Sequence, residues 1–354
     1  MVALEDRLLE LAAEIPPLDE AAAEEARRRH LGLTKPPFSL GELEELGARL
    51  AGMAGGCPPP VPENPAVVVC AGDHGVLERG VSPWPRAVTA AMVSNFCTGG
   101  AAVNAIAKTV GARVSVLDVG VAGELEWHPL LRAAKVRHGT GDLSRGPAMS
   151  REEAARAVMA GARVAEELVE SGGVDLLITG DMGIGNTTPA ACLISAFTGS
   201  PPEETTGRGT GIDDQTLKYK VNVVEEALEL HGPDPEDPLG VLAQIGGLEH
   251  AAIIGMILAG AVYGIPVILD GVVSGSAALA ARALASHSAG YIIAGHRSAE
   301  PGAYISLRSL DLCPLLDLDM RLGEGTGGLL AVPLVQAAAR TLAEMATLEE
   351  IGIG

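Results

Sequence analysis

The chain has 354 residues, with 25 Lys and Arg against 45 Asp and Glu, which gives a formal net charge of -20. That balance argues against nucleic acid as a partner, because neutralising phosphates needs a basic face. With 47% hydrophobic and only 3% aromatic residues, the composition predicts a sizeable core of small aliphatic side chains in one large α/β domain or two smaller ones.

The N-terminal part of the chain predicts three helices. Pro16 and Pro17 end the first helix, and its acidic, amphipathic sequence is not that of a signal peptide. The second begins near Asp19 with acidic residues and ends with basic ones, a charge order that suits the helix dipole. A proline-stiffened linker over 33–38 then leads to a helix over about 40–53.

From residue 66 onward, short apolar runs alternate with polar glycine loops and helical patterns. Strands are predicted at 66–70, 114–119, 174–179, 267–269 and 291–294, and Ser150 with Glu153 forms a capping box that opens a long helix. No element is assigned to the turn-rich residues 124–146. The order predicts an α/β fold with a mostly parallel, Rossmann-like sheet flanked by helices.

One stretch approaches the length of a membrane span, because Ala251 to Leu269 carries no charge. Gly264 and Pro266 divide it, so it predicts a buried helix followed by a short buried strand and no membrane partner. The five cysteines are an odd number without a CxxC pair, which fits reduced thiols in the cytoplasm and neither disulfides nor zinc.

Polar loops follow most of the predicted strands, where parallel sheets bind their ligands. We expect five of them to converge, at Asp73 and His74, at 181–188, at Asp270, at 296–300 and around Glu324. His74 and His296 fit acid/base groups, ligands or structural histidines, and the sequence leaves these alternatives open. No spacing in the chain is that of a metal site.

Residues 183–189 (Gly-Ile-Gly-Asn-Thr-Thr-Pro) are the best phosphate-binding candidate. They follow a strand and open a helix, and Pro189 suits a first helical turn. A tight turn capped by threonine explains the loop equally well, and it is neither a Walker loop nor GxGxxG. Residues 207–214 with Lys218 and Lys220 are a second anion candidate, although one lysine of the two fits a solvated helix face.

A third candidate comprises His296, Arg297 and Ser298, in which Arg297 binds a phosphate or pairs with Glu300. Glu324 stands between two glycines that let a ligand approach closely, and it fits either a general base or a favourable charge near the start of a helix. The residues alone therefore indicate an enzyme for a phosphorylated small molecule.

Taken together, these motifs resemble the nicotinate-nucleotide:dimethylbenzimidazole phosphoribosyltransferase family, whose enzymes assemble the lower ligand of cobalamin. The resemblance covers nearly the whole chain and rests on a set of motifs in order: Leu33 to Pro37, Asp73 to Gly75, Gly183 to Ala190, Gly246-Gly247, Asp270-Gly271, His296 to Glu300 and Arg321 to Gly327.

The resemblance implies transfer of the phosphoribosyl group of nicotinate mononucleotide to 5,6-dimethylbenzimidazole with anomeric inversion, without a cofactor or metal. It implies Glu324 as the general base and a set of phosphate-binding residues: Gly185, Asn186, Thr187, Lys220 and Ser298. It further implies a homodimer, with a small helical domain from residues 1–36 and 328–354 and a catalytic α/β domain from 37–327.

The same matching predicts a pocket for nicotinate, ribose or the acceptor base, lined by Asp73, His74, Trp84, Met92, Asp181 and Leu322. Asp181 departs from the family glutamate by one methylene, and Trp84 and Met92 depart from the polar residues expected there. Trp84 fits either a stacking platform for a flat base or a surface tryptophan. The alternative functions are a related phosphoribosyltransferase or N-glycosidase with another acceptor, and a non-catalytic nucleotide-binding protein.

Overall fold

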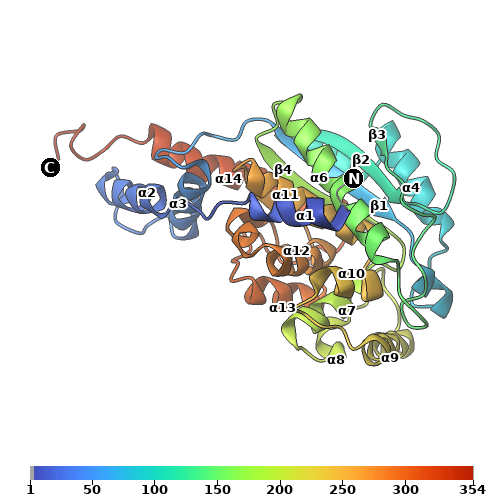
Figure 1. Cartoon of the computed structure of the whole chain (residues 1–354). Coiled ribbons are helices and arrows are strands. Elements are labelled where there is room, and N and C mark those ends of the chain that lie inside the picture. Colours follow the sequence, from blue (N-terminus) through green and yellow to red (C-terminus); the bar gives the residue numbers. More distant parts are fainter. Residues whose placement is uncertain (1–3, 354) are drawn as a thin grey trace.

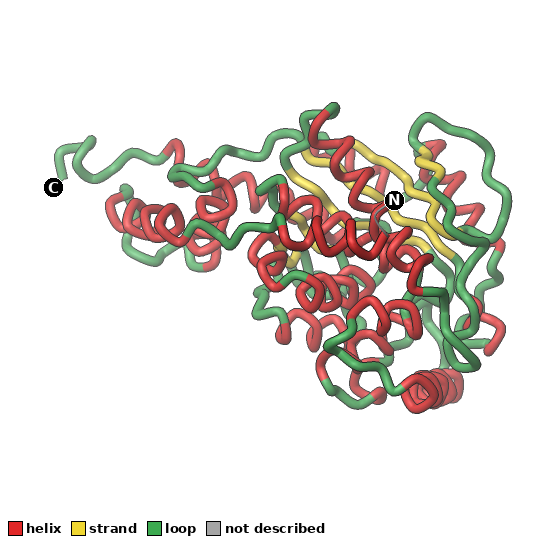
Figure 2. The backbone as a smooth tube through the Cα atoms, in the orientation of Figure 1, coloured by secondary structure: helices red, strands yellow, loops and turns green. Residues whose placement is uncertain are grey.

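The computed structural model describes residues 4–353, which form a six-stranded, all-parallel sheet flanked by helices (Figures 1 and 2). The strand order is β3-β2-β1-β4-β5-β6. The strands are β1 (Pro65–Gly72), β2 (Arg113–Gly120), β3 (Leu131–Ala133), β4 (Leu176–Met182), β5 (Val267–Leu269) and β6 (Ile292–Ala294). The predicted α/β class is confirmed, and the strand order reverses between β1 and β4, where such sheets open a crevice.

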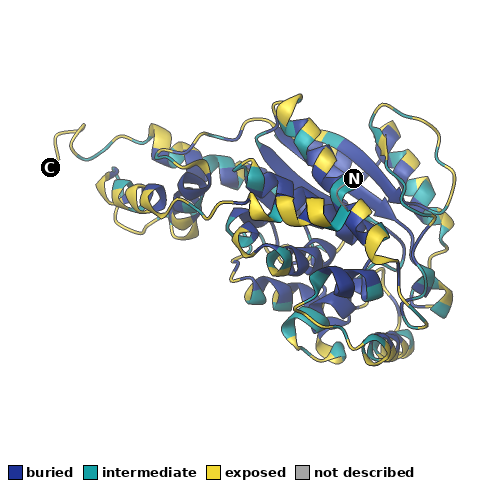
Figure 3. Cartoon of the chain, in the orientation of Figure 1, coloured by how far each residue is buried: buried dark blue, intermediate teal, exposed yellow. Residues whose placement is uncertain are grey.

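One face of the sheet is covered by α6 (Arg151–Glu170), α11 (Leu248–Val262) and α12 (Val272–Leu284). α11 is almost wholly buried, as Figure 3 shows by its dark colour. It packs against α6 at backbone distance, since an added Cβ at Gly161 would lie 1.8 Å from the Ala252 carbonyl oxygen. The same holds for Gly255 and Val158. This core is therefore built from backbones in close approach and small side chains.

The other face is covered by α4 (Ala87–Thr98), α5 (Ala102–Val110) and the first half of α14 (Thr326–Glu344). The second half of α14 leaves the sheet and packs with α2 (Glu20–Gly32) and α3 (Glu42–Ala54) in a lobe that projects from the α/β body (Figure 1). Leu33 pairs with Thr347 in an antiparallel bridge, which ties the two ends of the chain together there.

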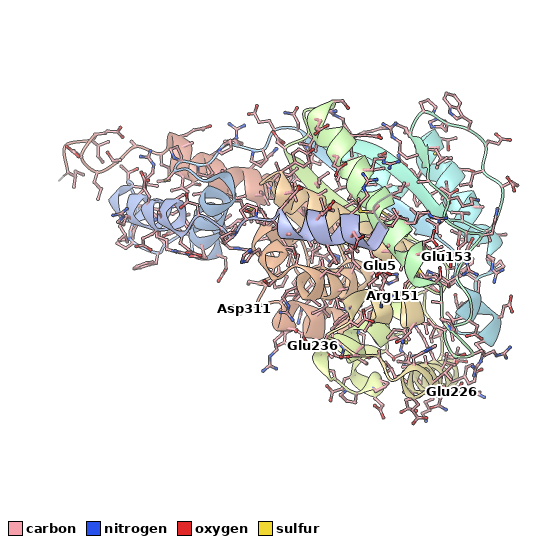
Figure 4. All side chains as sticks on the ribbon, in the orientation of Figure 1. Glu5, Arg151, Glu153, Glu226, Glu236 and Asp311 are labelled. Atoms are coloured by element: carbon pink, nitrogen blue, oxygen red, sulfur yellow. The ribbon has the colours of Figure 1, made fainter. Side chains whose placement is uncertain are left out.

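The first helix, α1 (Leu4–Ala13), lies on α6 and α11 rather than in this lobe. Glu5 Oε1 accepts a hydrogen bond from Arg151 Nε at 3.1 Å, and Arg151 also pairs with Asp237 (Figure 4). The division of the chain into a helical domain and a catalytic domain stays a prediction, and within residues 1–36 helix α1 contacts two helices that cover the sheet, α6 and α11.

Several short elements lie outside the sequence expectations. Residues 124–146 contain the edge strand β3. Helix α10 (Pro238–Ile245), for which no element was predicted, follows Asp237, whose side chain accepts from the Gly240 amide. The remaining helices are α7 (Thr187–Thr198), α8 (Pro202–Thr205), α9 (Asp214–His231), α13 (Pro301–Ser309) and the 3-10 turns η1 (Gly75–Arg79) and η2 (Ser286–Tyr291). The capping box of Ser150 and Glu153 is confirmed at the start of α6.

The prediction that Ala251 to Leu269 is a buried helix and strand is confirmed by α11 and β5. A different stretch, Ala87–Val110, is long and apolar enough to span a membrane by composition, and 39% of it is buried in the structure. Gly99, with φ of 86°, interrupts it and separates α4 from α5. The stretch is therefore two short helices on the sheet, and part of their apolar surface is not buried.

Candidate active site

A pocket that opens to solvent lies at the carboxyl ends of β4, β5 and β6. Its walls come from four of the polar loops predicted to converge and from the segment that starts α9. The lining residues used below are Ser82, Asp181, Gly185, Asn186, Thr187, Arg208, Gly209, Lys220, His296, Ser298, Glu300, Arg321 and Leu322. The sheet thus brings residues from distant parts of the sequence to one place.

All five residues predicted to hold a phosphate line this pocket, and Lys220 is the only buried lysine among the residues described. Gly185 has φ of 94°, a left-handed conformation that glycine adopts freely, and α7 begins two residues later. Lys220 Nζ donates to Thr187 Oγ1 at 2.7 Å and to the Gly207 carbonyl at 3.0 Å. Burial lowers the pKa of Lys220 to about 8.

The opposite wall is held by hydrogen bonds between loops. Glu300 Oε1 accepts from the Gly209 amide at 2.9 Å, and Arg321 donates to the Gly209 carbonyl at 2.6 Å. Arg297 instead pairs with Asp317 on the surface and does not line the pocket, so its predicted pairing with Glu300 is wrong. Of the two candidate lysines, Lys218 is the one on the solvated helix face.

Glu324 lies beside the pocket at the start of α14. Gly323, Glu324 and Gly325 have φ of 85°, 65° and 90°, so three consecutive residues are left-handed. The Glu324 side chain is buried, and its Oε2 accepts a hydrogen bond from the Val103 amide at 3.2 Å. Burial raises the pKa of Glu324, the Val103 amide opposes this rise, and the charge of Asp270 adds to it.

Asp181 occupies the end of β4 and faces the same turn. Its Oδ2 accepts from Asn186 Nδ2 at 2.9 Å, and its backbone carbonyl accepts from the Glu324 amide at 3.2 Å. Burial, followed by the charges of Asp270 and Glu249, raises the pKa of Asp181 well above its usual range. Asp181 therefore joins the phosphate loop to the Glu324 turn.

Asp73 and His74 follow β1 but do not line the pocket. His74 Nε2 lies 2.7 Å from Glu249 Oε1, and both side chains are fully buried. Burial acts to raise the pKa of Glu249, but the charges of His74 and His250 outweigh it and lower that pKa to about 2. Asp73 accepts from the Ala122 amide at 2.7 Å. The sheet thus places this buried cluster behind the phosphate loop.

Three of the six residues predicted for the nicotinate, ribose or base pocket, Leu322, Trp84 and Met92, lie at different depths. Leu322 lines the pocket and is 57% exposed, so it forms part of the rim. Trp84 is 51% exposed in a neighbouring surface hollow that shares Ser82 with the pocket. Met92 is half-buried on α4 and packs against the core. Of the three, the structure brings only Leu322 to the pocket.

Sequence reasoning missed two features around the pocket. Glu249 was not singled out, although a carboxylate and a histidine at the start of the wholly apolar α11 are a detectable signal of a buried polar cluster. Gly209 joins two walls through its backbone, a role that no side-chain pattern reveals. The assembled site offers one buried cation and a helix start for an anion, with two buried carboxyls beside them for proton transfer.

Comparison with known proteins agrees with this arrangement. A family model described as phosphoribosyltransferase matches residues 15–353. A nicotinate-nucleotide–dimethylbenzimidazole phosphoribosyltransferase of Salinispora tropica is 55% identical over 96% of this chain and 97% of its own length. One of Chloroflexus aggregans is 54% identical over 96% of each chain. The crystal structure of the Thermus thermophilus enzyme of that name superposes with a TM-score of 0.90 at 48% identity, covering 95% of this chain and 99% of its own. The chain therefore belongs to the nicotinate-nucleotide–dimethylbenzimidazole phosphoribosyltransferase family.

Proposed function

We propose that this chain transfers the phosphoribosyl group of nicotinate mononucleotide to a ring nitrogen of 5,6-dimethylbenzimidazole. The anomeric centre inverts, and the products are α-ribazole 5′-phosphate and nicotinate. The observation that carries this proposal is the joint position of a buried lysine, a helix start and a buried carboxylate beside one pocket. The family relatives, named for this reaction, support the same conclusion.

The phosphate end of the donor fits the loop at the start of α7. Gly185, Asn186 and Thr187 lie at the N-terminal end of that helix, where anions are stabilised. Lys220 supplies the only full positive charge buried there and is already held by the Thr187 hydroxyl. Ser298 completes this wall with a hydroxyl. A bound phosphate would compensate for the burial that lowers the Lys220 pKa to about 8.

Glu324 acts as the general base in this proposal. It takes the proton from the acceptor nitrogen as the ring attacks the ribose, and a raised pKa brings a carboxylate closer to the value that suits a base near neutral pH. Nicotinate leaves from a pyridinium and needs neither metal nor cofactor to depart. Leu322 on the pocket rim is the apolar side chain that we propose for the acceptor side.

We propose that the protein works as a cytoplasmic homodimer. The partly exposed apolar side of α4 and α5 supports this, since apolar patches on soluble proteins commonly mark contacts between chains. Five cysteines without a disulfide suit a reducing compartment. Light scattering coupled to gel filtration measures the mass, and a single 36.1 kDa species at micromolar concentration would contradict the dimer.

The reaction is tested by chromatographic product analysis. Purified protein is incubated with nicotinate mononucleotide, with and without dimethylbenzimidazole, beside Glu324→Gln. An α-linked ribazole phosphate that requires both substrates and is lost in the variant is the expected result. Nicotinate released equally without acceptor would identify a hydrolase instead, and binding without turnover would identify a nucleotide-binding protein. Activity with another base alone would keep the mechanism and change the acceptor.

A further inference from the structure

Helix α14 begins without a side-chain cap of its own. Its N-cap position is Gly325, whose left-handed backbone carries no side chain that could accept from the helix amides. The first four amides of a helix lack partners within it, and leaving them buried and unpaired costs free energy. The residues at this helix start are buried beneath the pocket, so water does not accept hydrogen bonds from these amides.

Asp270, the residue directly after β5, supplies the missing acceptors from a distant part of the chain. Its Oδ1 accepts from the Gly327 amide at 2.7 Å and from the Gly328 amide at 3.1 Å, and its Oδ2 accepts from the Gly325 amide at 3.2 Å. Its side chain is fully buried. One carboxylate thus accepts hydrogen bonds from three backbone amides in the four residues that follow Glu324.

These three hydrogen bonds matter for Glu324 because its backbone conformation is strained. A φ of 65° is uncommon for a residue with a side chain and persists only where its surroundings hold it. One side of the turn is held by β4, since an added Cβ at Gly180 would lie 2.6 Å from the Glu324 carbonyl oxygen. The Asp270 carboxylate holds the other side, immediately after Glu324.

We propose that Asp270 is a positioning residue that fixes the turn presenting the Glu324 carboxylate to the pocket. His296 supports Asp270 in turn, with its Nε2 3.5 Å from Asp270 Oδ1 and its ring against Gly327. The inference rests on the proposed function for the catalytic role of Glu324. The hold on the turn itself stands on geometry alone.

Asp270 also sets the charge around the base. The titratable groups near Glu324 are Asp181 on β4, Asp270 after β5 and His296 after β6, with Glu249 of α11 acting on Asp181 from behind. The Asp270 charge is one cause of the raised Glu324 pKa. Its removal lowers that pKa, so Glu324 would stay deprotonated, and active, to lower pH. The acid limb would stay unmoved only if Glu324 were not the group whose protonation limits turnover.

The experiment compares Asp270→Asn and Asp270→Ala with wild type. Asp237→Asn is the matched control, because Asp237 caps α10 through the Gly240 amide at the surface and away from the pocket. We expect kcat to fall about 100-fold in the Ala variant, the scale of a roughly 1 Å misplacement. The fall is smaller in the Asn variant, with KM for nicotinate mononucleotide little changed and the acid limb shifted to lower pH. Asp237→Asn keeps kcat and its pH profile.

Hydrogen exchange of peptides covering residues 321–330 tests the hold on the turn without relying on catalysis. Faster exchange there in Asp270→Asn, but not in Asp237→Asn, is the expected result. Wild-type exchange rates and kcat in a folded Asp270→Asn would overturn the inference, and this variant also settles the question if Asp270→Ala does not fold. If wild type proves inactive with these substrates, the proposed function fails while the exchange measurement still decides the role of Asp270.

Discussion

The two halves of the pocket carry buried charges of opposite sign. The loop over 183–187 presents backbone amides at a helix start, with Lys220 as a cation behind them. The Glu324 turn gathers buried carboxyls instead, and the pKa values of Glu324 and Asp181 rise there. Both halves carry groups whose charge is unfavourable when buried, but only the first is relieved by an anionic ligand.

This difference separates binding from chemistry. A phosphate bound beside Lys220 would stabilise the positive charge of this buried lysine. Substitutions in this half therefore act chiefly on substrate affinity. A bound phosphate gives the carboxyl half no countercharge, and the raised pKa of Glu324 makes its carboxylate oxygens basic enough to accept a proton. Changes in that half act chiefly on turnover, and each prediction below tests this separation.

The largest effect is expected from Glu324→Gln, which keeps the shape of the side chain but cannot accept the proton. kcat falls by about 100- to 10,000-fold, the usual contribution of a positioned general base. KM for nicotinate mononucleotide stays near that of wild type because the phosphate loop is unchanged. Steady-state kinetics with both substrates varied measures the two constants. A rise in KM as large as the fall in kcat would show that the halves are not separate.

The second effect is expected from Lys220→Met, which removes the buried cation and keeps the bulk of its stem. A hydrogen bond to a charged group contributes about 1.5–3 kcal/mol, so KM rises by about ten- to a hundredfold while kcat changes little. Lys218→Met, on the exposed face of the same helix, is the matched control and keeps both constants. Equal losses in the two variants would indicate long-range charge rather than contact.

A third test is the pH dependence of stability through Asp181. Its pKa is raised in the folded chain, so the stability it contributes is present below the ordinary aspartate pKa and is lost as pH rises through the folded value. Asp181→Asn removes this loss and is more stable than wild type near neutral pH, by about 1.4 kcal/mol for each pH unit between the unfolded and folded pKa values. Denaturant unfolding across pH measures it. For Asp237, whose pKa Arg151 lowers, the asparagine variant changes stability in the opposite direction.

The smallest effect is expected from Trp84→Ala, since Trp84 is half exposed in a hollow beside the pocket. Relative turnover over a panel of benzimidazoles and purines changes by less than about threefold, the scale of a contact worth under about 0.7 kcal/mol. Competition assays with paired bases measure these ratios. A selective loss of the larger bases would place Trp84 on the acceptor and extend the carboxyl half of the pocket to the surface hollow.

Much of this arrangement was predictable from sequence because it depends on local patterns. Apolar runs ending in glycine and polar residues located β1, β4 and β5, and the rule that ligands bind at carboxyl ends placed Asn186 and Ser298 near Glu324. The long-range hydrogen bonds were not predictable. Asp270 caps a helix that starts 56 residues later, and the sequence of neither segment indicates that the two are hydrogen-bonded. Arg297 was misjudged because its partner Asp317 lies 20 residues away on another turn.

Helix α14 connects the Glu324 turn with the projecting lobe. Its first residues follow the Glu324 turn, and its last turns pack with α2 and α3 in the projecting lobe. Nineteen helical residues span about 28 Å at 1.5 Å per residue. One helix therefore joins the catalytic turn to the projecting lobe, and Pro333 inside it removes one backbone hydrogen bond between the two.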